Sequence, residues 1–349
     1  MLNLKSEHGD PMKNVLIIGG GLAGCTAART LSGFDIPSVI LESSPSLGGK
    51  VRQFGCKSGS SCSQCGVCAA GNLWDEVERD ENITILLDSS LIDLRKEACG
   101  FSAYIKSGSD FIEKSFSDIV LANGFLDYAS NAKTALDMDR SESILTGMDL
   151  ERALYRRTAS ELFAEPPKKV AYVLCFGSRS VKEKANYCSR VCCGYSTRSA
   201  KVIRHYYPEC EITFFYMDMQ TTNALSAFMQ DMNEPGIRFI RCRPARITVN
   251  GNDPEIIYED SGVLARETFD KVILCGGIHP NSDNVTLSDL TGLRVDENGF
   301  LEYVKPPEKT HVYLAGCVSG PKSIRETVAE ARDVGLRIAQ ISEQDGILA

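Results

Sequence analysis

The stretch Asn14-Val-Leu-Ile-Ile-Gly-Gly-Gly-Leu-Ala-Gly24 decides the fold of this chain. Its first five residues form an apolar run that is typical of a buried parallel strand. The glycines that follow, Gly19, Gly21 and Gly24, have the spacing G-x-G-x-x-G. Gly19 permits a tight turn, Gly21 lets the backbone approach a pyrophosphate, and Gly24 allows close packing of the next helix. The stretch therefore predicts the first turn of a dinucleotide-binding βαβ unit.

The residues after this stretch indicate which dinucleotide is held. A helix is predicted for residues 25–31, and a second strand over 38–41 ends at the acidic Glu42. A carboxylate at this position can bind a ribose hydroxyl pair, which favours FAD or NAD over the 2′-phosphate of NADP. A second glycine pair, in Gly48-Gly49-Lys50, follows Glu42 closely and favours FAD over NAD.

Three more apolar runs extend the pattern. Those at 118–124 and 270–277 end in glycine turns, and that at 311–316 leads into Cys317-Val-Ser-Gly-Pro-Lys322 and a helix to about Gln340. This arrangement resembles the two-dinucleotide-fold flavoprotein disulfide reductases of thioredoxin reductase type. That family usually has Gly-Asp where this chain has Gly316-Cys317, the Asp binding the ribityl chain. The cysteine here leaves the ribityl contact to backbone groups.

The predicted fold is therefore α/β, with two Rossmann-like dinucleotide-binding domains of the disulfide-reductase type, the second inserted in the first. The expected boundaries are 1–124 and 269–349 for the FAD domain, 125–167 for a linker, and 168–268 for the inserted domain. The residues expected to bind FAD are Gly19, Gly21, Leu22, Ala23, Gly24, Glu42, Ser43, Gly49, Lys50, Gly124, Gly316, Cys317 and Lys322.

The inserted domain lacks a glycine fingerprint of its own and carries cysteines instead. Its first strand, 169–175, ends at Cys175, and three more cysteines follow in Cys188-Ser-Arg-Val-Cys192-Cys193 before a helix predicted from Thr197 to Tyr207. This spacing does not match the common ferredoxin runs, but a strand end and a helix N-terminus can converge four thiolates on one cubane. Structural zinc and inert buried thiols are the alternatives.

With these four cysteines the chain resembles the flavoprotein component of heterodisulfide reductase, its A subunit, over about residues 13–340. The segment Ala315-Gly-Cys-Val-Ser-Gly-Pro-Lys322 is also typical of that family. The resemblance implies that Cys175, Cys188, Cys192 and Cys193 hold one 4Fe–4S cluster near FAD, in a homodimer that joins other subunits. The chain lacks the extra N-terminal domain and ferredoxin modules of the methanogen form, and Arg198 stands where a lysine is expected. Both departures argue against electron bifurcation, and the short form looks more like the A subunit of the heterodisulfide-reductase-like complex of sulfur-oxidising bacteria.

A second cysteine group lies in the Gly/Ser-rich loop 55–71: Cys56, Cys62, Cys65 and Cys68. Its C-x2-C-x2-C run is typical of iron–sulfur proteins, but the usual fourth cysteine followed by proline is missing. A second cluster, redox-active thiols near the flavin, a partner contact and ordinary loop cysteines all stay open at this point. The isolated residues Cys25, Cys99, Cys210, Cys242 and Cys275 are predicted to be buried structural thiols, and Trp74 to be core or interface.

Composition narrows the classes of function. The formal net charge is −8 and there is no basic stripe, so nucleic acid is not an expected partner. No run of residues is long and apolar enough to span a membrane, and the polar residues 1–13 carry no apolar export signal. Fourteen cysteines in such a chain indicate metal or redox chemistry in a reducing compartment, and the cytoplasm is expected.

Together these features predict an electron-transfer flavoprotein subunit that contains FAD and a 4Fe–4S cluster and passes electrons to partner subunits, in the oxidation of sulfur compounds. One alternative is a self-contained NAD(P)H-dependent disulfide reductase with a thiol pair such as Cys62 and Cys65, against which the missing second fingerprint counts. The other is an FAD protein with a structural four-cysteine zinc site.

Overall fold

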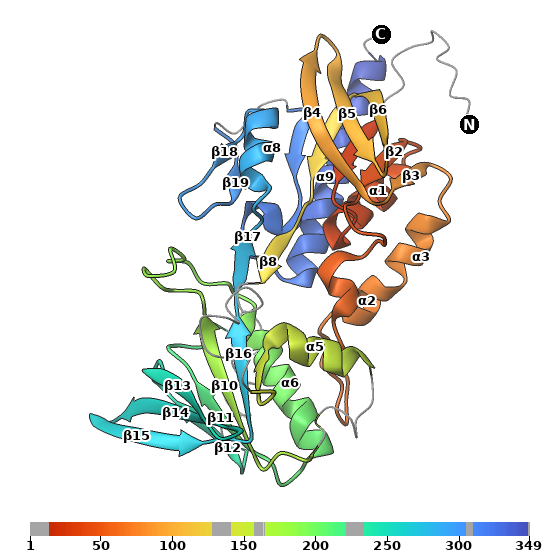
Figure 1. Cartoon of the computed structure of the whole chain (residues 1–349). Helices are drawn as coiled ribbons and strands as arrows, with labels where there is room; N and C mark the ends of the chain where they lie inside the picture. Colours follow the sequence, from red (N-terminus) through yellow and green to blue (C-terminus); the bar gives the residue numbers. More distant parts are fainter. Residues whose placement is uncertain are drawn as a thin grey trace.

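Two parallel β-sheets organise the chain. The structure is a computed structural model that describes residues 14–127, 141–156, 163, 165–220, 234–304 and 310–347. Within these ranges each of two units is built on a five-stranded sheet, and the first unit lies above the second in Figure 1. The predicted α/β fold with two Rossmann-like sheets is confirmed.

The first sheet has the strand order β20-β7-β1-β2-β3, and all its pairs are parallel. Its strands are β1 (Val15–Ile18), β2 (Ser38–Leu41), β3 (Ile83–Leu86), β7 (Asp118–Leu121) and β20 (Val312–Leu314). The apolar run predicted from the sequence is the central strand β1, which is buried along its whole length because both faces of the sheet are covered.

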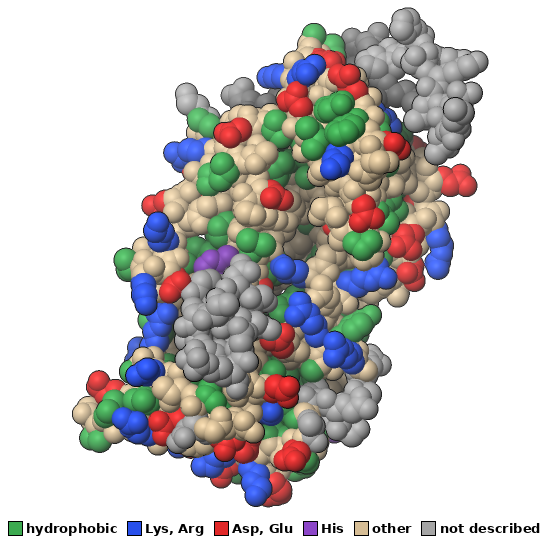
Figure 2. All heavy atoms as spheres, viewed as in Figure 1, with side chains coloured by type: hydrophobic (Ala, Val, Ile, Leu, Met, Phe, Trp, Pro, Cys, Tyr) green, Lys and Arg blue, Asp and Glu red, His purple; other side chains and the backbone are tan. Residues whose placement is uncertain are grey.

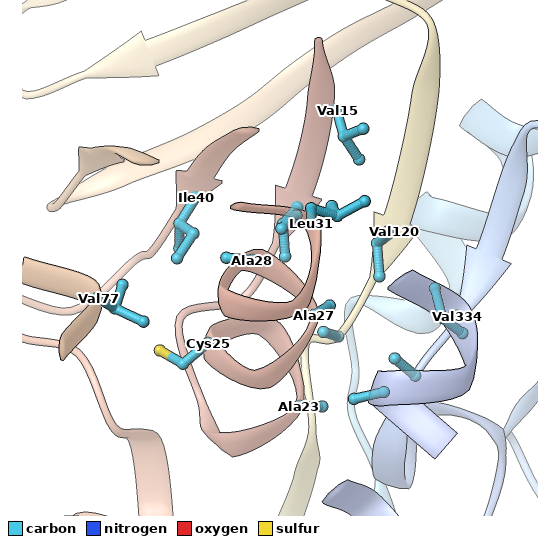
Figure 3. Packing of buried hydrophobic residues seen from close by; sticks show 14 of the residues in the cluster. Val15, Ala23, Cys25, Ala27, Ala28, Leu31, Ile40, Val77, Val120 and Val334 are labelled. Atoms are coloured by element: carbon cyan, nitrogen blue, oxygen red, sulfur yellow. The ribbon is translucent and has the colours of Figure 1, made fainter. Parts of the chain in front are cut away.

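Helices cover one face of this sheet, and a small antiparallel sheet covers the other. The helices are α1 (Leu22–Ser32), α3 (Leu73–Glu78) and α9 (Ile324–Ile347), and the sheet is β4 (Ser89–Glu97), β5 (Gly100–Ser107) and β6 (Asp110–Phe116). On the helical face, Ala27 and Leu31 of α1 belong to one buried cluster with Val15 of β1 and Val334 of α9 (Figure 3). Trp74, at 7% exposure, belongs to the same core.

The second sheet has the order β12-β11-β10-β16-β9, again with parallel pairs. Its strands are β9 (Ile144–Thr146), β10 (Lys169–Phe176), β11 (Glu211–Phe215), β12 (Ile237–Ile240) and β16 (Lys271–Gly276). One face carries α5 (Gly147–Arg156) and α6 (Cys192–Tyr206). The other packs against an antiparallel sheet of β13 (Arg246–Asn250), β14 (Asp253–Asp260) and β15 (Val263–Thr268).

The second unit differs from the expected 168–268 range at both ends. Strand β9 comes from the expected linker and β16 from the expected FAD domain, because both pair with the sheet around β10. Helix α6 begins at Cys192, five positions before the predicted Thr197. The helical stretch expected over 223–232 lies outside the described residues.

Short elements connect the two units. Strand β8 (Phe125–Asp127) pairs with β17 (Ile278–Pro280) between them (Figure 1). The first unit also contains η1 (Gly49–Gln53), α2 (Val67–Gly71), α8 (Asn284–Thr291), β18 (Arg294–Val295), β19 (Leu301–Glu302) and η5 (Gly316–Ser319).

Candidate functional site

A cavity of about 880 Å³ lies at the carboxyl ends of β1, β2 and β7. Ligands of open parallel sheets bind at this edge, because the loops that follow the strands meet there. Eleven of the thirteen residues expected to bind FAD line the cavity: Gly19, Gly21, Leu22, Ala23, Glu42, Ser43, Gly49, Lys50, Gly124, Cys317 and Lys322. Gly24 and Gly316 do not line it.

Each glycine of the fingerprint is required for a different steric reason. Gly19 has φ +110°, and a Cβ there would overlap the carbonyl oxygen of Ala122 at the end of β7. A Cβ on Gly24 would overlap the carbonyl oxygen of Gly19, so Gly24 sets the approach of α1 to the turn. Around Gly21 no protein atom lies within 4 Å of an added Cβ. Gly21 is therefore open on the cavity side and leaves room for a ligand.

The acid at the end of β2 closes one side of the turn. Glu42 Oε2 accepts a hydrogen bond from the Gly20 N–H at 2.7 Å, and Oε1 accepts from the N–H and Oγ of Ser44 at 2.8 and 2.6 Å. These donors hold a buried carboxylate in one orientation at the cavity wall.

At the other end of the cavity, η5 and Lys322 are tied together. The Lys322 ammonium donates to the Gly316 carbonyl at 2.9 Å and to Ser319 Oγ at 2.8 Å, and the Gly316 N–H donates to Glu330 at 2.6 Å. Gly316 thus positions the lysine without lining the cavity itself. Lys50 also lines the wall, and burial lowers the pKa of its ammonium.

The four cysteines of the second unit come together behind this wall. Strand β10 has a bulge between Val173 and Phe176, at which Cys175 has φ +56°. Regular alternation would place Leu174 and Cys175 on opposite faces of the sheet, but the bulge brings both to the α6 face. There Cys175 meets Cys192 and Cys193, the first two residues of α6.

The thiols of this group interact directly. Cys192 lies within hydrogen-bond reach of Cys175 and Cys193, and these contacts lower the pKa of Cys175 to about 7, with further help from the Arg179 guanidinium. The same contact lowers the pKa of Cys193, whereas burial raises that of Cys188, the least buried of the four. The Arg190 N–H donates to Cys188 Sγ at 3.3 Å. The contacts therefore favour the thiolate at Cys175 and Cys193, whereas the pKa of Cys192, which donates to both, is raised. The thiolate is the form of cysteine that binds metal.

Helix α6 connects this cysteine group to the large cavity. Val191, Gly194, Tyr195 and Arg198 line the cavity at the spacing of one helix face, while none of the four cysteines does. Sequence reasoning missed Val191, Gly194 and Tyr195 because it began the helix at Thr197, whereas Arg198 stands where the sequence comparison expected a lysine close to the flavin. The i, i+3, i+4, i+7 spacing from Val191 is the signal that could have found them.

The cysteine segment is also fixed to the first unit. Arg190 forms an ion pair with Glu326 of α9 at 2.5 Å, and Tyr187 Oη donates to the Ile278 carbonyl at 3.0 Å.

Among the predicted structural thiols, Cys25, Cys210 and Cys275 are buried and Cys242 is half-buried. The prediction is wrong for Cys99, which is exposed in the tight turn between β4 and β5.

The second cysteine group borders a cavity of its own. Cys56, Cys62, Cys65 and Cys68 all line a hollow of about 510 Å³ against α9, and Cys65 also lines the large cavity. In the part of the chain that the structure describes, neither cysteine group nor any other three His, Cys, Asp or Glu side chains have the geometry to hold a metal ion.

On the surface, acidic and basic side chains are interspersed over the face in Figure 2. Among the described helices, none combines the length and apolar character that crossing a bilayer requires.

Comparisons with known proteins agree with the predicted resemblance. Residues 17–63 match the family model of the NAD(P)-binding Rossmann-like domain. The A subunit of the H(2):CoB-CoM heterodisulfide,ferredoxin reductase of Methanothermobacter marburgensis is 33% identical over 65% of this chain and 37% of its own length. An iron-sulfur A subunit (number 2) of the CoB–CoM heterodisulfide reductase of Methanopyrus kandleri is 22% identical over 97% of this chain and 65% of its own.

Solved structures support the fold. Thioredoxin reductase of T. acidophilum superposes with a TM-score of 0.63 at 16% identity, covering 95% of this chain and 99% of that one. A NAD-dependent persulfide reductase from A. fulgidus superposes with a TM-score of 0.57 at 18% identity, covering 93% of this chain and 58% of that one.

These comparisons confirm that the chain is related to the A subunits of CoB-CoM heterodisulfide reductases. It spans between about a third and two thirds of the length of these curated relatives. The relatives and the structural neighbours reported above are named as reductases.

Proposed function

From its relationship to the A subunits of heterodisulfide reductases, we propose that this chain is an electron-transfer flavoprotein subunit that binds FAD and one 4Fe–4S cluster. One observation carries the proposal: α6 forms part of the wall of the dinucleotide cavity, and the first two residues of that helix belong to the four-cysteine group. In a reductase with this fold, the turn after the first strand of the second sheet would carry a nicotinamide-binding fingerprint. Here that turn carries thiols.

The residues around the large cavity fit FAD. The turn from Gly19 to Gly21 leaves an open approach to the N-terminus of α1, where a pyrophosphate is stabilised by the helix dipole. Glu42 is held as a hydrogen-bond acceptor at the position that suits ribose hydroxyls. Lys50 and Lys322 supply positive charge at the wall. When bound, FAD accepts or donates two electrons and can pass them on one at a time.

The residues of the first cysteine group fit an iron–sulfur cluster chemically. Cys175, Cys188, Cys192 and Cys193 provide four sulfur ligands, and the pKa of Cys175 is lowered to about 7. The N–H of Arg190 points at one sulfur, and the N-terminus of the 15-residue helix α6 faces the group. Both features lower the electrostatic cost of a negatively charged centre. A cluster at this place would carry single electrons.

The proposal also covers the oligomeric state, the partner subunits and the cellular compartment of the chain. We propose that it works as a cytoplasmic homodimer within a heterodisulfide-reductase-like complex, and that partner subunits carry out the substrate chemistry, the oxidation of sulfur compounds. The names of its relatives as subunits support the complex. The abundance of cysteines supports a reducing compartment.

The test is metal, sulfide and flavin content of anaerobically purified protein. Cys192→Ser should keep its FAD and contain about four fewer irons and sulfides per FAD than wild type. Cys210→Ser is the matched control, because Cys210 is buried in the same core but outside the four-cysteine group. It should keep all its iron.

Two results would overturn the proposal in different ways. Zinc without sulfide in the wild-type protein would mean a structural metal site. Rapid bleaching of the flavin by NADH or NADPH alone would mean a self-contained disulfide reductase, with Cys65 in the cavity wall as its candidate thiol.

A further inference from the structure

The second cysteine group surrounds a single hollow. Cys56, Cys62, Cys65 and Cys68 form one side of the 510 Å³ cavity, and Ile324, Arg325, Val328 and Arg332 of α9 form the other. The loop therefore places four cysteines, spread along a Gly/Ser-rich segment, at the wall of one hollow that is open to solvent.

The backbone of the loop favours a metal-bound thiolate. The Gln64 N–H donates to Cys62 Sγ at 3.4 Å, and Gln64 has φ +50°. The same arrangement occurs at Cys188, where the Arg190 N–H donates to Sγ at 3.3 Å and Arg190 has φ +62°. An amide donor stabilises a sulfur that carries negative charge. The second group thus repeats the local geometry of the first.

Cations approach the loop from two helices. Arg325 of α9 donates to the Gln64 carbonyl at 3.0 Å, and Arg198 of α6 donates to the Ser63 carbonyl at 3.3 Å. Arg332 lies in the cavity wall. Four thiolates around a cluster leave a net negative charge, and guanidinium groups at this range reduce its cost.

The loop is held in place on both sides. Lys57 and Glu151 form an ion pair at 2.6 Å with side-chain exposures of 4% and 8%, and the Gly55 N–H donates to the same carboxylate at 3.1 Å. Further along, Gly59 packs against His205 of α6 and Gly66 against Ile324. Metal ligands on a loop need this kind of support, because an unsupported loop would lose entropy on binding.

We propose that Cys56, Cys62, Cys65 and Cys68 bind a second iron–sulfur cluster of the 4Fe–4S type. A cluster fits better than a single ion for two reasons. The run from Cys62 to Cys68 has the spacing C-x2-C-x2-C that is typical of iron–sulfur proteins, and each thiolate of a cubane binds a different iron, so the four sulfurs need not converge on one ion. The hollow also shares Lys57, Ser63, Gln64, Cys65, Ile324 and Arg325 with the flavin cavity. The second cluster would thus lie directly beside the flavin, and in this respect alone the inference rests on the proposed function.

The experiment counts iron, acid-labile sulfide and zinc per FAD in protein purified without oxygen, and records EPR spectra after reduction with dithionite. We expect about eight irons and eight sulfides per FAD in the wild-type protein, and about four in Cys65→Ser and in Cys192→Ser. Each variant should lose a different EPR signal. Cys99→Ser is the control, because Cys99 is exposed and remote from both groups in the sequence. FAD content and circular dichroism show that each variant is folded.

Each other result has a definite meaning. If Cys65→Ser keeps the wild-type iron content while Cys192→Ser loses all of it, the second cluster does not exist and the proposed function stands. If Cys65→Ser loses all the iron and Cys192→Ser none, the second site holds and the proposed ligands of the first cluster are wrong. Zinc lost on Cys65→Ser, or a Cys62–Cys65 disulfide in the isolated protein, would overturn the inference. Cys62→Ser and Cys68→Ser repeat the test at exposed positions, where folding is least at risk.

Discussion

The substitution Gly21→Ala separates ligand binding from folding in the dinucleotide turn. Gly21 has φ −77° and ψ −169°, an extended conformation that any L-residue adopts without strain. An added Cβ would meet no protein atom within 4 Å. Without FAD, the variant should therefore unfold at the same or a slightly higher urea concentration than wild type, with a free energy of unfolding that is equal or up to about 1 kcal/mol higher, since alanine restricts the unfolded chain.

With FAD the expectation reverses. If the pyrophosphate passes over Gly21, the new methyl group occupies its space and must be accommodated by displacement. Overpacking by one methyl costs about 1–3 kcal/mol, which corresponds to roughly 5- to 150-fold weaker binding. The assay is titration of flavin-free protein with FAD, followed by flavin fluorescence or calorimetry.

Gly24→Ala is the matched control. Its Cβ would overlap the Gly19 carbonyl oxygen and lie 3.1 Å from Ile17 Cγ2, so it should destabilise the protein even without FAD. Equal FAD affinity of wild type and Gly21→Ala would refute the placement of the pyrophosphate. Loss of stability in flavin-free Gly21→Ala would refute the steric argument itself.

Further outcomes are expected for four substitutions. Glu42→Gln should weaken FAD binding by about 1–3 kcal/mol, measured by the same titration, because the carboxylate that accepts three hydrogen bonds at the wall loses its charge; unchanged affinity would exclude a ribose contact. Glu151→Gln should lower the free energy of unfolding of flavin-free protein by about 3–5 kcal/mol in urea, since it leaves the buried Lys57 ammonium unpaired. Arg152→Gln, which breaks the more exposed pair with Asp149, should cost less than about 0.5 kcal/mol. The loss of stability caused by Lys57→Met should depend on pH. Burial already raises the pKa of Glu151, and removal of the Lys57 ammonium raises that pKa further. The pKa of Glu151 is then higher in the folded protein than in the unfolded chain. Its protonated carboxyl group therefore stabilises the folded state at low pH, and this stabilisation is lost as the pH rises. The variant should therefore fall further behind wild type at about pH 8 than at about pH 5, and a constant difference between the two would contradict this.

Much of the first unit was predictable because its signals are local. The apolar run before Gly19, the glycine spacing and the acid after the second strand lie within one βαβ unit, so neighbouring residues determine one another's positions. The assignment of β9 and β16 to the second sheet was not predictable in this way. Both strands pair with partners far along the chain, and apolar strands carry no local mark of the sheet they join.

The cysteines show most clearly which features the sequence determines and which depend on the tertiary structure. Sequence alone determined which thiols exist, their grouping into two sets, and the absence of a second glycine fingerprint, because these depend only on the order of residues. Only the tertiary structure decided what the thiols face. Strand alternation by itself would turn Cys175 away from Leu174, and the bulge in β10 brings it to the α6 face instead. Likewise the hollow beside Cys65 exists only because α9, from the other end of the chain, packs against the loop. A residue's type sets its chemistry, whereas its partners depend on long-range packing that no local pattern encodes.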